Sequence, residues 1–360
     1  MGNWFQSSSL EPSPLLKQHG PRGENLEKLL WEVHSAGVPP NRGSLWGRCL
    51  CVDSLRELER QDLFQHLLDL PLDDERVIYA EVCIQKDLDR VFPHCFGQAR
   101  AEYCRKKYLV LLAYAQRCPE IGYEGGMHFI VGVLLAVMDT EEAFWCFCSI
   151  IEKMLPAGFF SLGDPVSDSF VIELELFGQL LESTCPDLAA HLAHLQVGTE
   201  LVLVSWYKSF FMCLEAPHDV KLRLLDALFL QGLDGLHHIS LLLLKAERSR
   251  FLQCQTFEEA VQLLAVLPID YNGCNFLEAS VAFPLQQRRE EVIGVKGRHP
   301  RALTRSYEIS WSIQDHWRMP CRHQRVVMLL LMAMTWPSTS SSSLLQLPKA
   351  LWINRILPFT

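Results

Sequence analysis

Apolar residues recur at intervals of three and four along most of the chain, the spacing that places them on one face of an α-helix. The sequence contains no sustained alternation of apolar and polar residues, the pattern typical of strands. Helices are therefore expected over residues 25–33, 54–70, 84–92, 101–117, 129–138, 140–151, 170–181, 188–195, 201–214, 220–230, 236–251 and 256–267. This pattern predicts an all-α fold, and the lack of a fixed repeat period argues against a solenoid.

Local signals mark several of the expected helix ends. Ser54 and Glu57 have the spacing of a capping box, which predicts a helix that begins there and ends before Pro71. Gly232 follows a helical stretch in the position where glycine commonly stops a helix. The segment 129–138 is apolar on all sides, so we expect it to form a buried helix at the centre of the core.

A charged helix end at residues 84–93 is the first candidate for chemistry. Asp87 and Arg90 are three positions apart, which places both side chains on the same face of a helix. Pro93 ends that helix, so Arg90 would lie near an exposed end. Taken alone, this cluster is also typical of an ordinary surface ion pair.

Two short sequences resemble the signatures of the TBC domain, the helical domain of GTPase-activating proteins for Rab GTPases. The first signature is Ile-x-x-Asp-x-x-Arg followed by a proline, and it is matched by Ile84, Asp87, Arg90 and Pro93. The second signature, Gly-Tyr-x-Gln-Gly-Met, is matched over residues 122–127, except that Gly125 replaces the glutamine.

Weaker similarities extend the resemblance over residues 24–283. The segment 37–39 reads Gly-Val-Pro and is followed by Arg42 and Trp46, as in the family's entry signature, where the arginine and the tryptophan are structural. Residues 222–226 are similar to the family's Leu-Arg-x-Trp-Asp segment, with Leu225 in place of the tryptophan and Asp226 at its end.

The resemblance implies a role for each site residue. Arg90 corresponds to the arginine finger that enters the GTPase active site, and Asp87 to the residue that orients it. The family's glutamine aligns the attacking water through an amide that both donates and accepts hydrogen bonds, which Gly125 cannot do. The residues expected to contact the partner are Tyr123, Glu124 and Gly126. We expect His128 to point elsewhere, and a carboxylate at position 124 would repel the γ-phosphate.

The resemblance also implies the function and the architecture. It predicts a multi-helix domain of two helical lobes that activates a Rab-family GTPase in its GTP form, with impaired activity for want of the glutamine. GTP and Mg²⁺ would belong to the partner, so the chain would hold no cofactor and would not itself be an enzyme. One alternative is a non-catalytic Rab-binding scaffold or effector in membrane trafficking, and another is a helical interaction domain without a GTPase partner.

Composition narrows the picture further. The chain has 360 residues, of which 49% are hydrophobic, and a net charge of −9, which argues against a nucleic-acid partner. None of its 13 cysteines forms a Cys-x-x-Cys pair, so we expect no metal site and a reduced, cytoplasmic chain. The longest apolar runs fall short of the ~20 residues that a membrane span needs, so any membrane contact would be peripheral. The resemblance implies that such contact would be with endomembranes, through the Rab.

Both ends of the chain differ in composition from the middle. Residues 1–23 are rich in Ser, Pro and Gly and are expected to form a disordered tail, with the TBC-type domain over residues 24–283. Residues 284–360 are basic and then serine-rich, and we expect them to be loosely ordered. The basic part could contact acidic lipid or simply be a solvated tail.

Overall fold

The computed structural model of the chain describes residues 12–20, 28–29, 41–88, 100–161, 168–214, 216–265 and 285–298. These residues all belong to one compact unit, residues 1–298. The helices among the described residues are α1 (Pro14–His19), α3 (Arg42–Cys49), α4 (Val52–Arg56), α5 (Leu63–Asp69), α6 (Glu75–Asp87), α7 (Arg100–Arg117), α8 (Met127–Leu134), α9 (Thr140–Ser149), the π-helix η1 (Ile150–Met154), α10 (Asp168–Thr184), α11 (Pro186–His194), α12 (Thr199–Lys208), α13 (His218–Gln231), α14 (Leu233–Ala246), α15 (Arg248–Phe251), α16 (Phe257–Ala265) and α17 (Leu285–Arg298).

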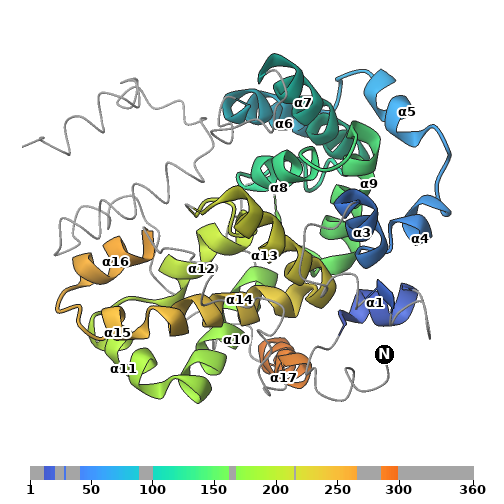
Figure 1. Ribbon diagram of the computed structural model, residues 1–360. Helices are drawn as coiled ribbons and strands as arrows, with labels where there is room; N and C mark the ends of the chain where they lie inside the picture. The colour runs from blue at the N-terminus through green and yellow to red at the C-terminus, as the bar shows by residue number, and fades with distance from the viewer. Residues whose placement is uncertain are drawn as a thin grey trace, which may run out of the picture. The chain divides into compact units, whose positions relative to one another are not determined.

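The described helices pack in two groups (Figure 1). In the first group, α7 lies against α5, α6, α8 and α9. In the second group, α10 contacts α11, α12, α14 and α17, and α13 packs on α14. Helix α3 connects the groups because it contacts α4 and α9 as well as α13. No strand occurs among the residues that the structure describes, and the prediction of an all-α fold is confirmed.

The expected helix over residues 54–70 is divided in two. Helix α4 ends at Arg56 and α5 begins at Leu63, with turns between them. Ser54 does not cap a helix start; it lies within α4, and its hydroxyl donates to the carbonyl oxygen of Cys51. Leu58, an apolar residue in the turns between the two helices, has an exposed fraction of 77%. The prediction of one continuous helix is therefore wrong, because its apolar stripe is interrupted at Leu58.

Part of the expected N-terminal tail is packed against the second group of helices. The Ser13 hydroxyl caps α1 by accepting from the backbone N–H of Leu16, whose side chain is buried. The backbone N–H of Ser13 donates to the carbonyl oxygen of Leu230 at the end of α13, over 2.9 Å. Residues 12–20 thus differ from the disorder expected of residues 1–23.

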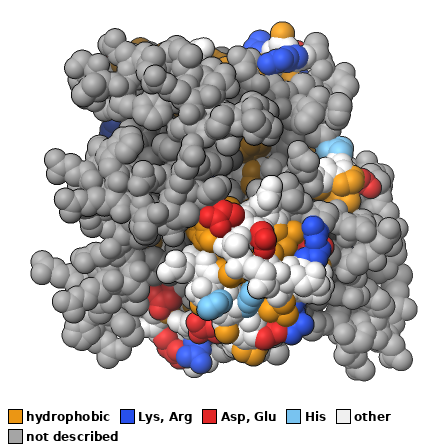
Figure 2. All heavy atoms as spheres, turned by 90° about the vertical axis from the view of Figure 1, so that its left-hand side faces the viewer, with side chains coloured by type: hydrophobic (Ala, Val, Ile, Leu, Met, Phe, Trp, Pro, Cys, Tyr) orange, Lys and Arg blue, Asp and Glu red, His pale blue; other side chains and the backbone are white. Residues whose placement is uncertain are grey.

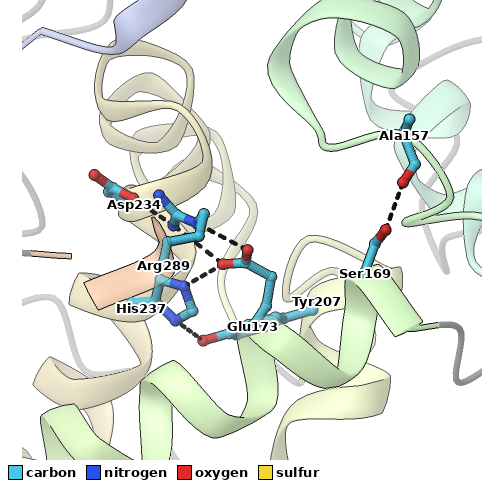
Figure 3. Close-up of polar contacts among 7 residues, drawn as sticks. All are labelled: Ala157, Ser169, Glu173, Tyr207, Asp234, His237 and Arg289. Atoms are coloured by element: carbon cyan, nitrogen blue, oxygen red, sulfur yellow. Dashed lines mark hydrogen bonds and ion pairs between the residues drawn. The ribbon is translucent and has the colours of Figure 1, made fainter. Parts of the chain in front are cut away.

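The C-terminal boundary expected at residue 283 also differs from the structure, because α17 packs against α10. A buried ion pair holds it there: the guanidinium of Arg289 donates through Nε and Nη2 to the two carboxylate oxygens of Glu173, over 2.9 and 3.1 Å (Figure 3). Arg289 also donates to Asp234 of α14 over 2.7 Å. Apart from this helix, the predicted C-terminal tail lies outside the described residues.

The carboxylate of Glu173 is also the end of a buried hydrogen-bond chain. His237 of α14 lies with Nε2 2.8 Å from Glu173 and Nδ1 2.8 Å from the hydroxyl of Tyr207, the penultimate residue of α12 (Figure 3). The Nε2–H tautomer satisfies both contacts, since Nε2 donates to the carboxylate and Nδ1 accepts from the hydroxyl. Helices α10, α12, α14 and α17 are thereby joined through polar side chains in the core.

Candidate functional site

The two signature segments meet through a hydrogen bond between Asp87 and Tyr123. Asp87 is the last residue of α6, and Tyr123 lies in the turn that leads into α8. The Tyr123 hydroxyl donates to Asp87 Oδ2 over 2.8 Å. Tyr123 is almost fully buried, whereas the side chain of Asp87 retains an exposed fraction of 16%. The end of α6 is thus fixed beside the glycine-rich turn.

His128 is a third member of this cluster that the sequence analysis missed. Its Nδ1 lies 3.0 Å from the Tyr123 hydroxyl and 3.9 Å from Asp87 Oδ2, so the side chain does not point elsewhere as expected. The single hydroxyl proton of Tyr123 is given to Asp87, so the contact from His128 requires a proton on Nδ1. A histidine five residues after a tyrosine is a weak signal, because only the turn between them brings the two rings together.

Lys107 of α7 holds the C-terminal end of α6. Its ammonium donates to the carbonyl oxygen of Leu88, the residue that follows Asp87, over 3.0 Å. A cation at this position complements the partial negative charge of a helix C-terminus. Lysines are normally solvated, but the exposed fraction of Lys107 is only 1%. Arg105, two positions earlier, is exposed and pairs with Glu102.

The turn over residues 122–127 depends on two glycines. Gly122 and Gly126 have φ values of 58° and 109°, which other residues rarely adopt. A Cβ atom on Gly126 would lie 2.9 Å from the carbonyl carbon of Lys208 and closer still to its oxygen. The turn therefore lies directly on the backbone at the end of α12.

Replacing Gly126 with alanine is expected to lower the free energy of unfolding by more than about 2 kcal/mol, because the positive φ and the contact with Lys208 both oppose a side chain. Urea unfolding followed by circular dichroism measures the change. The matched control is Gly178→Ala within α10, where an added Cβ would meet nothing within 4 Å. That variant should gain about 0.5–1 kcal/mol in stability. Equal effects of the two substitutions would contradict this account of the turn.

Glu124 and Gly125 occupy the middle of the same turn. The carboxylate of Glu124 accepts from Lys208 Nζ over 3.0 Å and from the backbone N–H of Ser161 over 3.0 Å, so it points into the protein. The exposed fraction of this side chain is 12%. Gly125 is partly exposed and is not among the glycines with positive φ.

The structure describes most of the expected site residues. It joins Asp87 to Tyr123 and places Gly125 two residues beyond Tyr123, in the same turn. Of the three residues expected to contact a partner, Tyr123 and Gly126 are buried, and Glu124 is largely engaged by Lys208. Arg90 and Pro93 lie outside the described residues, as does the expected entry segment 37–39.

The arginine and tryptophan of the entry signature bind a buried aspartate on α13. Arg42 donates through Nε and Nη2 to the two carboxylate oxygens of Asp226, over 2.9 and 3.0 Å. The indole N–H of Trp46 donates to the same carboxylate over 2.8 Å. Asp226 has no exposed side-chain surface, so these contacts join segments 184 residues apart within the core.

The described residues offer no second chemical site. They contain no cluster of three potential metal ligands, and no described helix could span a membrane. His191 contacts the carbonyl oxygen of Cys254 through Nε2 over 3.0 Å. On the described part of the face in Figure 2, acidic, basic, histidine and apolar side chains are intermixed, without a concentration of basic residues.

The chain is similar to known proteins over most of its length. Residues 40–252 match the Rab-GTPase-TBC domain family. The chain is similar to TBC1 domain family member 2A of Mus musculus, with 28% identity over 302 residues, which cover 80% of this chain and 30% of that protein. It is also similar to human TBC1 domain family member 10B, with 32% identity over 193 residues, which cover 51% of this chain and 23% of that protein. The chain spans less than a third of the length of these relatives.

Solved structures show the same fold. The crystal structure of the Chlamydomonas flagellar RabGAP TBC domain aligns with a TM-score of 0.58 at 19% identity, over 78% of this chain and 89% of that one. The YPT/RAB-GAP domain of GYP1P aligns with a TM-score of 0.54 at 15% identity, over 79% of this chain and 96% of that one.

Proposed function

Because the chain belongs to the Rab-GTPase-TBC domain family, we propose that it is a GTPase-activating protein for GTP-loaded Rab-family GTPases. The observation that carries this proposal is the hydrogen bond of 2.8 Å from Tyr123 to Asp87. Arg90 follows Asp87 by three residues, and Gly125 follows Tyr123 by two. The bond therefore links the segment that leads to the arginine finger with the turn that carries the degenerate glutamine position.

In this proposal, Arg90 acts on the active site of the partner. Small GTPases hydrolyse GTP slowly because the charge of the transition state is poorly stabilised, and an arginine supplied in trans accelerates the reaction by about 10³–10⁵. The guanidinium of Arg90 would bind the phosphoryl oxygens, and the carboxylate of Asp87 would orient it. GTP and Mg²⁺ come with the GTPase, and the chain is not itself an enzyme.

Gly125 weakens this activity because it offers no amide to align the attacking water. The neighbouring carboxylate of Glu124 does not substitute for it, since Lys208 and the backbone of Ser161 hold that carboxylate inside the protein. We therefore propose Rab binding with slower acceleration than a glutamine-bearing member of the family would give.

Gly125, which lacks an amide, and Glu124, whose carboxylate is held inside the protein, also favour a second candidate. This candidate is a non-catalytic Rab-binding scaffold or effector. Such a protein would keep the GTP-loaded Rab bound and would reach endomembranes through it. Rab affinity without any acceleration of hydrolysis distinguishes this candidate from an activator. A helical interaction domain without a GTPase partner would bind no member of a panel of GTP-locked Rabs.

Single-turnover GTP hydrolysis on a panel of Rabs tests the proposal. We expect the wild type to accelerate hydrolysis slowly and Gly125→Gln to accelerate it more. Adding Arg90→Ala to Gly125→Gln should reduce the acceleration by about 10³-fold or more. The backbone at position 125 is compatible with glutamine because its φ is not positive.

Binding of the same variants to GTP-loaded Rabs is measured in parallel. Acceleration that survives Arg90→Ala would contradict the arginine-finger proposal. Wild-type acceleration that equals that of Gly125→Gln would show that the missing amide is not needed.

A further inference from the structure

Lys208 places an ammonium group in an unusual, buried environment. The residue is 4% exposed, and its Nζ lies 5.2, 4.8 and 4.6 Å from the ring centroids of Phe159, Phe160 and Phe170. Nζ also donates to the carbonyl oxygen of Phe159 and lies 3.0 Å from the Glu124 carboxylate. A charge removed from water is costly unless it is paired, whereas aromatic faces and a carboxylate both stabilise a cation. We call this set of contacts the Lys208 clamp.

The backbone that follows Lys208 is strained. Phe210 and Phe211 have φ values of 51° and 63°, a conformation that bulky residues seldom adopt, and both side chains are fully buried. A hydrogen bond of 2.7 Å from the backbone N–H of Phe211 to the carbonyl oxygen of Trp206 closes this turn. Strain of this kind persists where the surrounding structure enforces it, and it is concentrated at functional sites. Here the strained turn directly follows Lys208, whose carbonyl group lies against Gly126.

Two further contacts hold the parts of the clamp in place (Figure 3). The Tyr207 hydroxyl contacts His237, which is joined to Glu173, so the last turn of α12 is attached to α10 and α14. The Ser169 hydroxyl donates to the carbonyl oxygen of Ala157 over 2.6 Å, and this bond ties the segment that carries Phe159 to α10. The last turn of α12, which carries Lys208, and the segment that carries Phe159 thus have contacts with α10 and α14 in addition to those with the turn.

We propose that Lys208 is a positioning residue for the turn that carries Gly125, an inference that rests on the proposed binding of a GTP-loaded GTPase. The ammonium holds the carboxylate of Glu124 inside the protein, and the backbone carbonyl of Lys208 packs against Gly126. The clamp thereby fixes the shape of the turn and keeps a negative charge away from the phosphates of the partner's nucleotide.

The first test uses the isolated protein and needs no GTPase. Hydrogen exchange of the amides over residues 123–128 is compared in the wild type, in Lys208→Met and in Lys208→Met/Glu124→Gln. We expect exchange to rise at least about tenfold in the single variant, because Glu124 is left buried without its cation, and to fall back in the double variant. The matched control is Lys221→Met. The ammonium of Lys221 donates to the carbonyl oxygen of Met212 and not to the turn. Unchanged exchange in Lys208→Met, or an equal rise in every helix, would overturn the proposal.

The second test measures affinity for a GTP-loaded Rab that the wild type binds. Lys208→Met should weaken binding about tenfold, and Glu124→Gln added to it should restore most of the affinity, because the repelling charge is gone. Weakened binding that the second substitution does not restore would overturn the electrostatic part of the proposal. If the exchange results hold and the wild type binds no Rab, the proposed function fails while the positioning of the turn by Lys208 stands.

Discussion

Replacing Asp226 with alanine is expected to lower the free energy of unfolding by about 3–5 kcal/mol. The carboxylate of Asp226 accepts two hydrogen bonds from Arg42 and one from Trp46. The substitution removes these acceptors and leaves the guanidinium of Arg42, which is only 7% exposed, without its buried counter-charge. Urea unfolding at neutral pH measures the loss, and we expect a fall in melting temperature of roughly 10 °C.

An exposed pair with the same geometry provides the control. Arg60 binds Asp62 through Nε and Nη2, as Arg42 binds Asp226, but the two side chains are 50% and 65% exposed. Exposed pairs contribute little, so Asp62→Ala should leave the free energy of unfolding almost unchanged. If the two alanine variants lost the same stability, burial would not be the source of the effect at Asp226.

Arg289→Ala is expected to cost about 3 kcal/mol and to release α17 from α10. The reason is that Glu173, which is 1% exposed, would keep a buried charge after losing both hydrogen bonds from the guanidinium. Limited proteolysis within residues 285–298, combined with urea unfolding, measures both effects. Arg288→Ala is the control, because Arg288 is 48% exposed and its guanidinium pairs with an equally exposed Glu291.

The stability lost in Arg289→Ala should also depend on pH. Burial raises the pKa of Glu173, but the hydrogen bonds from His237 and Arg289 and the charge of Arg289 outweigh it, so the pKa lies below the ordinary value of 4.5. A carboxyl group with a lowered pKa in the folded state stabilises the protein above its unfolded pKa, and this contribution is lost as the pH falls through the folded value. The difference between wild type and Arg289→Ala should therefore shrink in acid. If the difference in the free energy of unfolding between wild type and Arg289→Ala stayed constant as the pH fell through the folded pKa of Glu173, the assignment of a buried carboxylate would be contradicted.

Most of the fold could be predicted from the sequence because helical periodicity is a local property. The apolar spacing over residues 101–117 and 170–181 agrees with α7 (Arg100–Arg117) and α10 (Asp168–Thr184). The packing of α17 could not be predicted in this way. Arg289 resembles the other basic residues around it, and what distinguishes it is Glu173, a carboxylate 116 residues earlier in the chain.

The site was partly predictable for a related reason. The signature residues Asp87 and Tyr123 were recognised one by one, and the structure adds the hydrogen bond between them. The contributions of His128, Lys107 and Lys208 were missed, because each depends on a contact between helices or turns that spacing along the chain does not encode. Lys107 and Lys208 are lysines, which are normally solvated, so their burial runs against the usual preference.

The attachment of α1 and α17 to the other helices has a consequence for fragments of this protein. A fragment trimmed to residues 40–252, where the family match lies, would omit Ser13, which caps α1, and Arg289 of α17. Such a fragment would retain the carboxylate of Glu173 without its guanidinium and the carbonyl of Leu230 without the N–H of Ser13. A soluble recombinant version should therefore run from residue 12 to residue 298, even though the segments at its two ends lie outside the matched region.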